Sequence, residues 1–175
     1  MGKKKKEAAR LQELSNRVDR WLKGYQRASL LIMAVGIIVL LHAIMEVAGF
    51  MNNSFGSFGI TYSIHLWLLQ TPMEASWINA IYLAITFAIM ALFAAVSIFA
   101  AKGNAWAMYL GIGLYTADLV YIFVLSFLEG FASYYPMIIM HGVLLLGMGM
   151  MVFYYYKANY YWKLYQIEER NAGEK

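Results

Sequence analysis

The sequence predicts an all-α integral membrane protein, a four-helix bundle with both termini in the cytoplasm. Of its 175 residues 62% are hydrophobic and only 14% are charged, whereas an ordinary soluble domain is about 25% charged. Four apolar stretches are each long enough for a helix to cross the ~30 Å hydrocarbon core of a bilayer. These predicted spans are residues 29–51, 77–101, 105–127 and 134–156.

The basic residues give the predicted orientation. All 14 Lys and Arg lie before the first span, in the turn between the second and third spans, or after the fourth. The two segments on the opposite side, 52–76 and 128–133, contain none. Lys and Arg mark the cytoplasmic side of a membrane protein, so both ends are predicted to be cytoplasmic. In a bacterium the protein would lie in the cytoplasmic membrane.

Residues 1–28 are predicted to form a basic amphipathic helix in the cytoplasm or at the interface. Four lysines open this segment, and apolar residues from Leu11 to Tyr25 recur every three or four positions. Such a helix could bind anionic lipid, bind a partner, or lead into the first span and fix its topology. The tail, 157–175, combines aromatic residues with lysines, which favours interface anchoring over nucleic-acid binding.

The loop between the first two spans, 52–76, is predicted to be an apolar outer loop. Its segment 60–69 is too short to cross a bilayer. We expect an interfacial or partly re-entrant piece that caps the bundle, with His65 as an interfacial histidine. In the second span, small residues at helical spacing favour close packing against the first or third span, or against a second copy. These residues are Ala80, Ala84, Ala88, Ala91 and Ala95.

Four ionisable side chains inside the spans are the main functional clue. They are His42, Glu46, Asp118 and His141. His42 and Glu46 share one helix face. Counted from the outer span ends, the two histidines and Asp118 lie ~10–14 Å deep, and Glu46 lies one turn nearer the outside. Because such groups are costly in lipid, we expect them to meet in one sheltered pocket.

Tyr115 and Tyr121 lie three residues on either side of Asp118 and can donate hydrogen bonds. The pattern of His42 and Glu46 on one helix and Asp118 among tyrosines on a later one resembles the sterol-isomerase-like membrane superfamily. The second span here lacks the acidic residue of that family, so its activity is not carried over. Small multidrug transporters also have four helices, but with a lone central Glu in the first, whereas Glu46 is off-centre and follows His42.

Three functional classes fit these observations. The preferred one is binding or moving a cation, proton or small ligand, as a transport, sensing or accessory subunit. The second is an intramembrane enzyme that modifies lipid by acid–base or metal chemistry. The third is a structural partner subunit whose polar contacts hold helices together at ~0.6–2 kcal/mol each. Because four helices enclose little volume, a homodimer or a partner subunit is expected.

The residue types in the spans allow one kind of cofactor, a divalent metal ion. The chain has no cysteine, which excludes disulfides, thiol nucleophiles and Cys-based zinc sites. Two histidines and two carboxylates could hold a divalent ion such as zinc, iron or manganese. The candidate ligands for a metal are therefore the same four side chains, His42, Glu46, Asp118 and His141.

Overall fold

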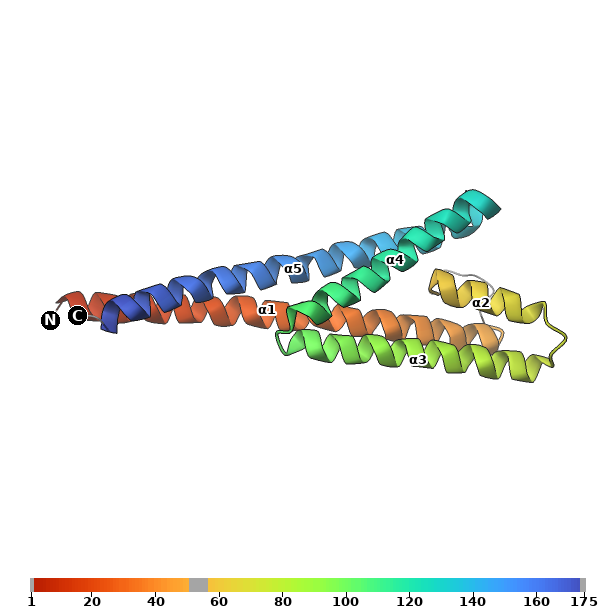
Figure 1. Ribbon diagram of the computed structural model, residues 1–175, viewed down its shortest axis with the longest axis horizontal. Helices are drawn as coiled ribbons and strands as arrows, with labels where there is room; N and C mark the ends of the chain where they lie inside the picture. Colours follow the sequence, from red (N-terminus) through yellow and green to blue (C-terminus); the bar gives the residue numbers. More distant parts are fainter. Residues whose placement is uncertain (1, 51–56, 174–175) are drawn as a thin grey trace.

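A computed structural model of the protein describes residues 2–50 and 57–173, and this part of the chain is all helical (Figure 1). Its helices are α1 (Gly2–Val47), α2 (Gly59–Leu69), α3 (Ala75–Ala101), α4 (Ala105–Glu129) and α5 (Phe131–Gly173). By length and composition α1, α3, α4 and α5 can each cross a membrane. The all-α class is thus confirmed, and four helices are long and apolar enough to be the predicted spans, although α1 ends at Val47, before the predicted end of the first span. Residues 1, 51–56 and 174–175, which belong to four of the predicted segments, lie outside the described residues.

The two longest helices, α1 and α5, continue past their predicted spans without a break. α1 begins and α5 ends at the same end of the molecule, where the two lie side by side (Figure 1). Arg10 forms an ion pair with Glu168 at 2.8 Å, and Arg17 donates to the Tyr161 hydroxyl at 3.1 Å. The ring of Trp21 packs on aromatic rings of α5. The amphipathic segment before the first span is therefore a helical lead-in paired with α5.

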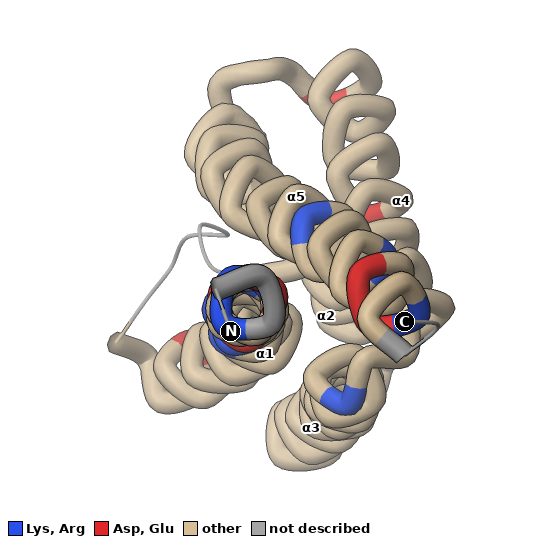
Figure 2. The backbone as a smooth tube through the Cα atoms, turned by 90° about the vertical axis from the view of Figure 1, so that its left-hand side faces the viewer, with Lys and Arg blue, Asp and Glu red and all other residues tan. Residues whose placement is uncertain are grey.

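Basic side chains lie toward this same end. Figure 2 looks onto it and shows Lys and Arg on α1, on α5 and at the near end of α3. Which side of the membrane this end occupies stays a prediction from the charge distribution.

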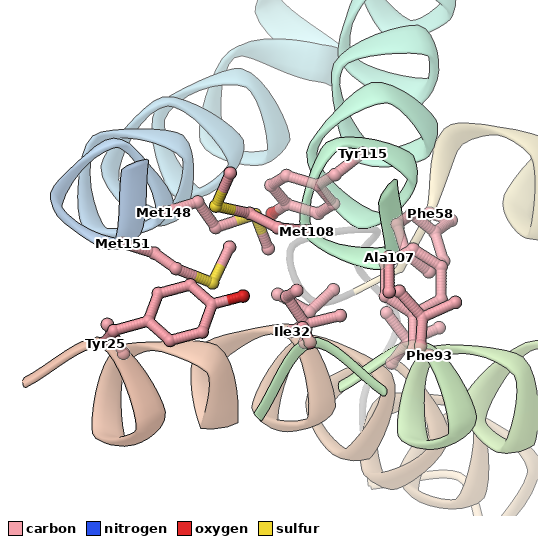
Figure 3. Close-up of a cluster of buried hydrophobic side chains, with 14 residues drawn as sticks. Tyr25, Ile32, Phe58, Phe93, Ala107, Met108, Tyr115, Met148 and Met151 are labelled. Atoms are coloured by element: carbon pink, nitrogen blue, oxygen red, sulfur yellow. The ribbon is translucent and has the colours of Figure 1, made fainter. Parts of the chain in front are cut away.

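The core forms where one stripe of α1 meets the other spans. The buried residues of this stripe recur every three or four positions, as expected for one face of a helix. They are Tyr25, Ala28, Ile32, Val35, Val39 and Ala43. Around them lie Phe93, Met108, Tyr115, Met148 and Met151, among others (Figure 3). A Cβ at Gly111 of α4 would come within 2.9 Å of the Ile32 side chain, so the glycine lets α4 approach α1 without displacing the end of that side chain.

The alanine stripe of α3 does not pack within the chain. Its five members, Ala80, Ala84, Ala88, Ala91 and Ala95, are exposed. The buried face of α3 instead carries Tyr82 and Ser97, which hydrogen bond to Glu46 and to the Ser29 carbonyl of α1. Polar groups in an apolar bundle need such partners, so they set the rotation of α3. Packing of the stripe against the first or third span was a wrong prediction.

The short helix α2 lies in the opening between the α1–α3 pair and the α4–α5 pair (Figures 1 and 2). Its first residues contact Asp118. From Asp118 to Glu129, the last residue of α4, the distance along the helix is about 16 Å. With 11 residues, α2 is itself about 16 Å long. Residues 59–69 of the predicted outer loop thus form a helix that begins deep between the long apolar helices.

The orientation can be tested with single introduced cysteines, because the chain has none of its own. We expect Lys102→Cys and Lys163→Cys to react with a membrane-impermeant maleimide only from the cytoplasmic side. Gln70→Cys, in the turn after α2, should react only from the outside. Labelling of intact and opened cells measures this, and reaction of all three positions from one side would contradict the topology.

Candidate functional site

Asp118 on α4 accepts the backbone N–H groups that begin α2. Its Oδ2 accepts from Gly59 at 2.9 Å and its Oδ1 from Ile60 at 3.2 Å. Phe58, which precedes α2, provides no side-chain cap. The first N–H groups of a helix have no partner within the helix, and leaving them unsatisfied in hydrocarbon costs several kcal/mol. Asp118 therefore caps α2 from a neighbouring helix, and the dipole of α2 favours a negative charge at this end.

Gly59 makes this cap sterically feasible. A Cβ at this position would lie 2.6 Å from the Ile122 side chain and 3.1 Å from the Tyr121 ring. Contacts this short force a shift of the backbone or of its neighbours. The distance between α2 and Asp118 thus depends on a residue without a side chain.

His141 on α5 completes the surroundings of Asp118. Its Nε2 lies 3.0 Å from Asp118 Oδ2, and its Nδ1 lies 2.9 Å from the Met137 carbonyl oxygen. A carbonyl only accepts, so Nδ1 carries a proton. Another proton must then lie between Nε2 and Oδ2, because two acceptors cannot bond each other. The pair thus shares one proton in a buried place.

An aromatic ring covers this histidine. His141 is fully buried, and the ring of Tyr115 stacks on it with centroids 4.6 Å apart and planes 7° from parallel. The Tyr115 hydroxyl is buried and has no hydrogen-bond partner among the described residues. Tyr115 therefore contributes packing to this cluster.

Glu46 on α1 forms a second cluster with α2 and α3. Its Oε1 lies 3.1 Å from His65 Nδ1, and its Oε2 accepts from the Tyr82 hydroxyl at 2.8 Å. The His65 ring stacks on Tyr82, with centroids 4.1 Å apart. His42 Nδ1 lies 3.9 Å from Glu46 Oε2, beyond hydrogen-bond distance. Glu46 therefore holds the middle of α2 through His65, as Asp118 holds its beginning.

From their similar depth, the side chains predicted for the site were expected to share one pocket. In the structure they lie in two clusters. Asp118, His141 and Tyr115 form one, and His42 and Glu46 belong to the other. Tyr121 donates to the Ser63 hydroxyl of α2 at 3.1 Å. The physical reason is the position of α2, which lies between the helix pairs (Figure 1). It contacts Glu46 of α1 through His65 and Asp118 of α4 through its first N–H groups.

Three members of these clusters were not found from the sequence. His65 was expected at the interface, Tyr82 lies in a span without charged residues, and Gly59 contributes only its backbone. The apolar composition of residues 60–69 was the one signal, because it allowed a re-entrant helix.

The geometry offers no support for the metal site considered for His42, Glu46, Asp118 and His141. Within residues 2–50 and 57–173, no three His, Cys, Asp or Glu side chains are placed to hold a metal ion. Protein metal sites usually need three or four such ligands. Here the two carboxylates are directed at different parts of α2.

An apolar cavity of about 340 Å³ lies beside Asp118, between α2, α3 and α4. Its walls include Phe58, Phe93 and Leu114, and among the described residues Asp118 is the only charged one that lines it. Leu114 and Ala117 are exposed on the outer surface of α4, so the cavity opens toward the side where lipid would lie. Apolar cavities of this size with few polar groups are typical of small-molecule sites.

No protein-family model, curated protein or solved structure matches this chain. By its four long apolar helices the protein belongs to the class of multi-pass integral membrane proteins.

The role of Gly59 can be tested by comparison with Gly113, beside which a Cβ would meet no atom within 4 Å. We expect Gly59→Ala to destabilise the protein by about 2–4 kcal/mol, because it combines overpacking with a weakened buried cap. Gly113→Ala should leave the melting temperature in detergent unchanged or slightly raised. Equal melting temperatures for the two variants would show that α2 does not need this close approach.

Proposed function

We propose that this protein binds a small, largely apolar molecule with a cationic or hydrogen-bond-donating group, and that binding is coupled to the position of α2. It would act as a sensing or accessory membrane subunit. One observation carries the proposal: Asp118 both lines the lipid-facing cavity and caps α2.

The chemistry of the cavity defines the class of ligand. Its lining is apolar apart from Asp118 and the hydroxyl of Tyr121. A carboxylate offers about four lone-pair positions, and Gly59, Ile60 and His141 use three of them. The remaining position can accept a donor from a bound molecule. An ammonium or hydroxyl group on an apolar body can donate to that position, whereas a carboxylate has no proton to donate.

The same lining residues explain how a ligand would act on the protein. Phe58 and Ile60, on either side of Gly59, border the cavity. The Phe58 ring also lies against Phe93 and Tyr115, with centroids 5.1 Å and 5.8 Å away. A ligand that fits only one arrangement of these residues would shift α2 toward that arrangement by its difference in affinity. Binding would thus change the outer part of the bundle.

Dodecylamine is a suitable probe, because it combines a cationic head with an apolar chain. We expect it to raise the melting temperature of the purified protein in neutral detergent in a concentration-dependent way, since a ligand of the folded state stabilises that state. Dodecanoate, with the same chain length and the opposite charge, should not. Equal effects of the two probes, or no effect of dodecylamine, would contradict the proposal.

Two alanine variants separate binding in the cavity from general insertion into detergent. Ala117 lines the cavity and has no side-chain hydrogen bond in the cap, so Ala117→Leu should fill part of the space and abolish the dodecylamine effect. Ala95→Leu adds the same volume to an exposed position of α3 outside the cavity and should retain it. An undiminished effect in Ala117→Leu would rule out this cavity as the site.

A further inference from the structure

A second cavity, of about 490 Å³, lies between α1 and α3 at the basic end of the spans. Of the described residues that line it, three are basic and none is acidic. Lys23 and Arg27 are one helical turn apart on α1, and Lys102 follows the last residue of α3. The cavity is therefore surrounded on this side by three positive charges from two helices.

The opposite side of this cavity is apolar. Leu30 and Met33 lie on α1 within the first predicted span, and Ile98 lies on α3 one turn before Lys102. The apolar stretch of α1 begins at Ser29, so the change from cationic to apolar lining coincides with the predicted edge of the hydrocarbon. The order along the cavity is that of a phospholipid, with a charged headgroup followed by acyl chains.

The three cations have no acidic partner within the described part of the chain. Arg10 and Arg17 of the same helix are paired with Glu168 and Glu13. No such ion pair is formed by Lys23, Arg27 or Lys102, and the Lys102 ammonium lies over the Phe99 ring. Like charges around one hollow repel each other and attract an anion. Phosphate oxygens bind well between Lys and Arg donors.

We propose that this cavity binds an anionic phospholipid, with the phosphate among Lys23, Arg27 and Lys102 and the first part of the acyl chains against Leu30, Met33 and Ile98. This site is distinct from the cavity beside Asp118 and does not depend on the function proposed above. A lipid bound here would bridge α1 and α3 where Ser97 already donates to the Ser29 carbonyl at 2.8 Å.

Native mass spectrometry of the full chain in neutral detergent, with phosphatidylglycerol and phosphatidylcholine in equal amounts, tests the assignment. We expect the protein to retain phosphatidylglycerol in preference. The variant Lys23→Gln/Arg27→Gln/Lys102→Gln should reduce this retention at least about tenfold, because each basic residue contributes to anionic lipid binding. The control Lys5→Gln/Lys6→Gln/Lys163→Gln removes the same charge from the same end, away from the cavity, and should retain the lipid.

A further variant tests the apolar half and leaves all three charges in place. Ile98→Trp should fill the space for the acyl chains and also reduce the retention of phosphatidylglycerol. This test is independent of how well the triple variant folds. Equal losses in the triple variant and its control would assign binding to general positive charge and overturn the proposal. It would equally be overturned by no preference for phosphatidylglycerol, by undiminished retention in Ile98→Trp, or by equally strong binding of glycerol 3-phosphate, which has no acyl chains.

Discussion

The hydrogen bonds between the Asp118 carboxylate and the first turn of α2 are the contact on which this arrangement of helices depends. A helix that begins between membrane spans exposes N–H groups that neither water nor its own carbonyls can satisfy. Asp118 accepts two of them, from Gly59 and Ile60, and through His141 it also joins α4 to α5. Three helices thus meet at one side chain, and without it the first N–H groups of α2 would lack this partner.

Two carboxylates share the task of holding α2, and their surroundings are alike. Each contacts a histidine whose ring is stacked on a tyrosine, His141 on Tyr115 and His65 on Tyr82. Glu46 links α1 to α2 and α3 through His65 and Tyr82. Asp118 differs because it also borders an apolar cavity. The stability of α2 and the binding of a ligand would therefore both depend on Asp118. A ligand that contacts Asp118 could thus change the position of α2.

The spans could be predicted from the sequence because apolar length and charge are direct requirements of a bilayer. Depth could also be predicted, since residues can be counted along a helix, and Asp118 and His141 do meet. The rotation of each helix could not, because side-chain packing decides it; hence Glu46 contacts His65 and Tyr82 instead of Asp118. The position of α2 could be predicted only as one of two alternatives, because an apolar segment of 11 residues fits an interface as well as a re-entrant helix.

The most direct test of the central contact is a solid-state NMR measurement on the protein in bilayers. With ¹⁵N in glycine and ¹³C at the aspartate carboxyl, dipolar recoupling reports whether the Gly59 nitrogen lies beside the Asp118 carboxylate. The account predicts a ¹⁵N–¹³C coupling, because the Gly59 nitrogen lies 2.9 Å from an oxygen of that carboxylate, and this coupling should disappear in Asp118→Leu. A Gly59 nitrogen with no coupling to any aspartate carboxyl would contradict it.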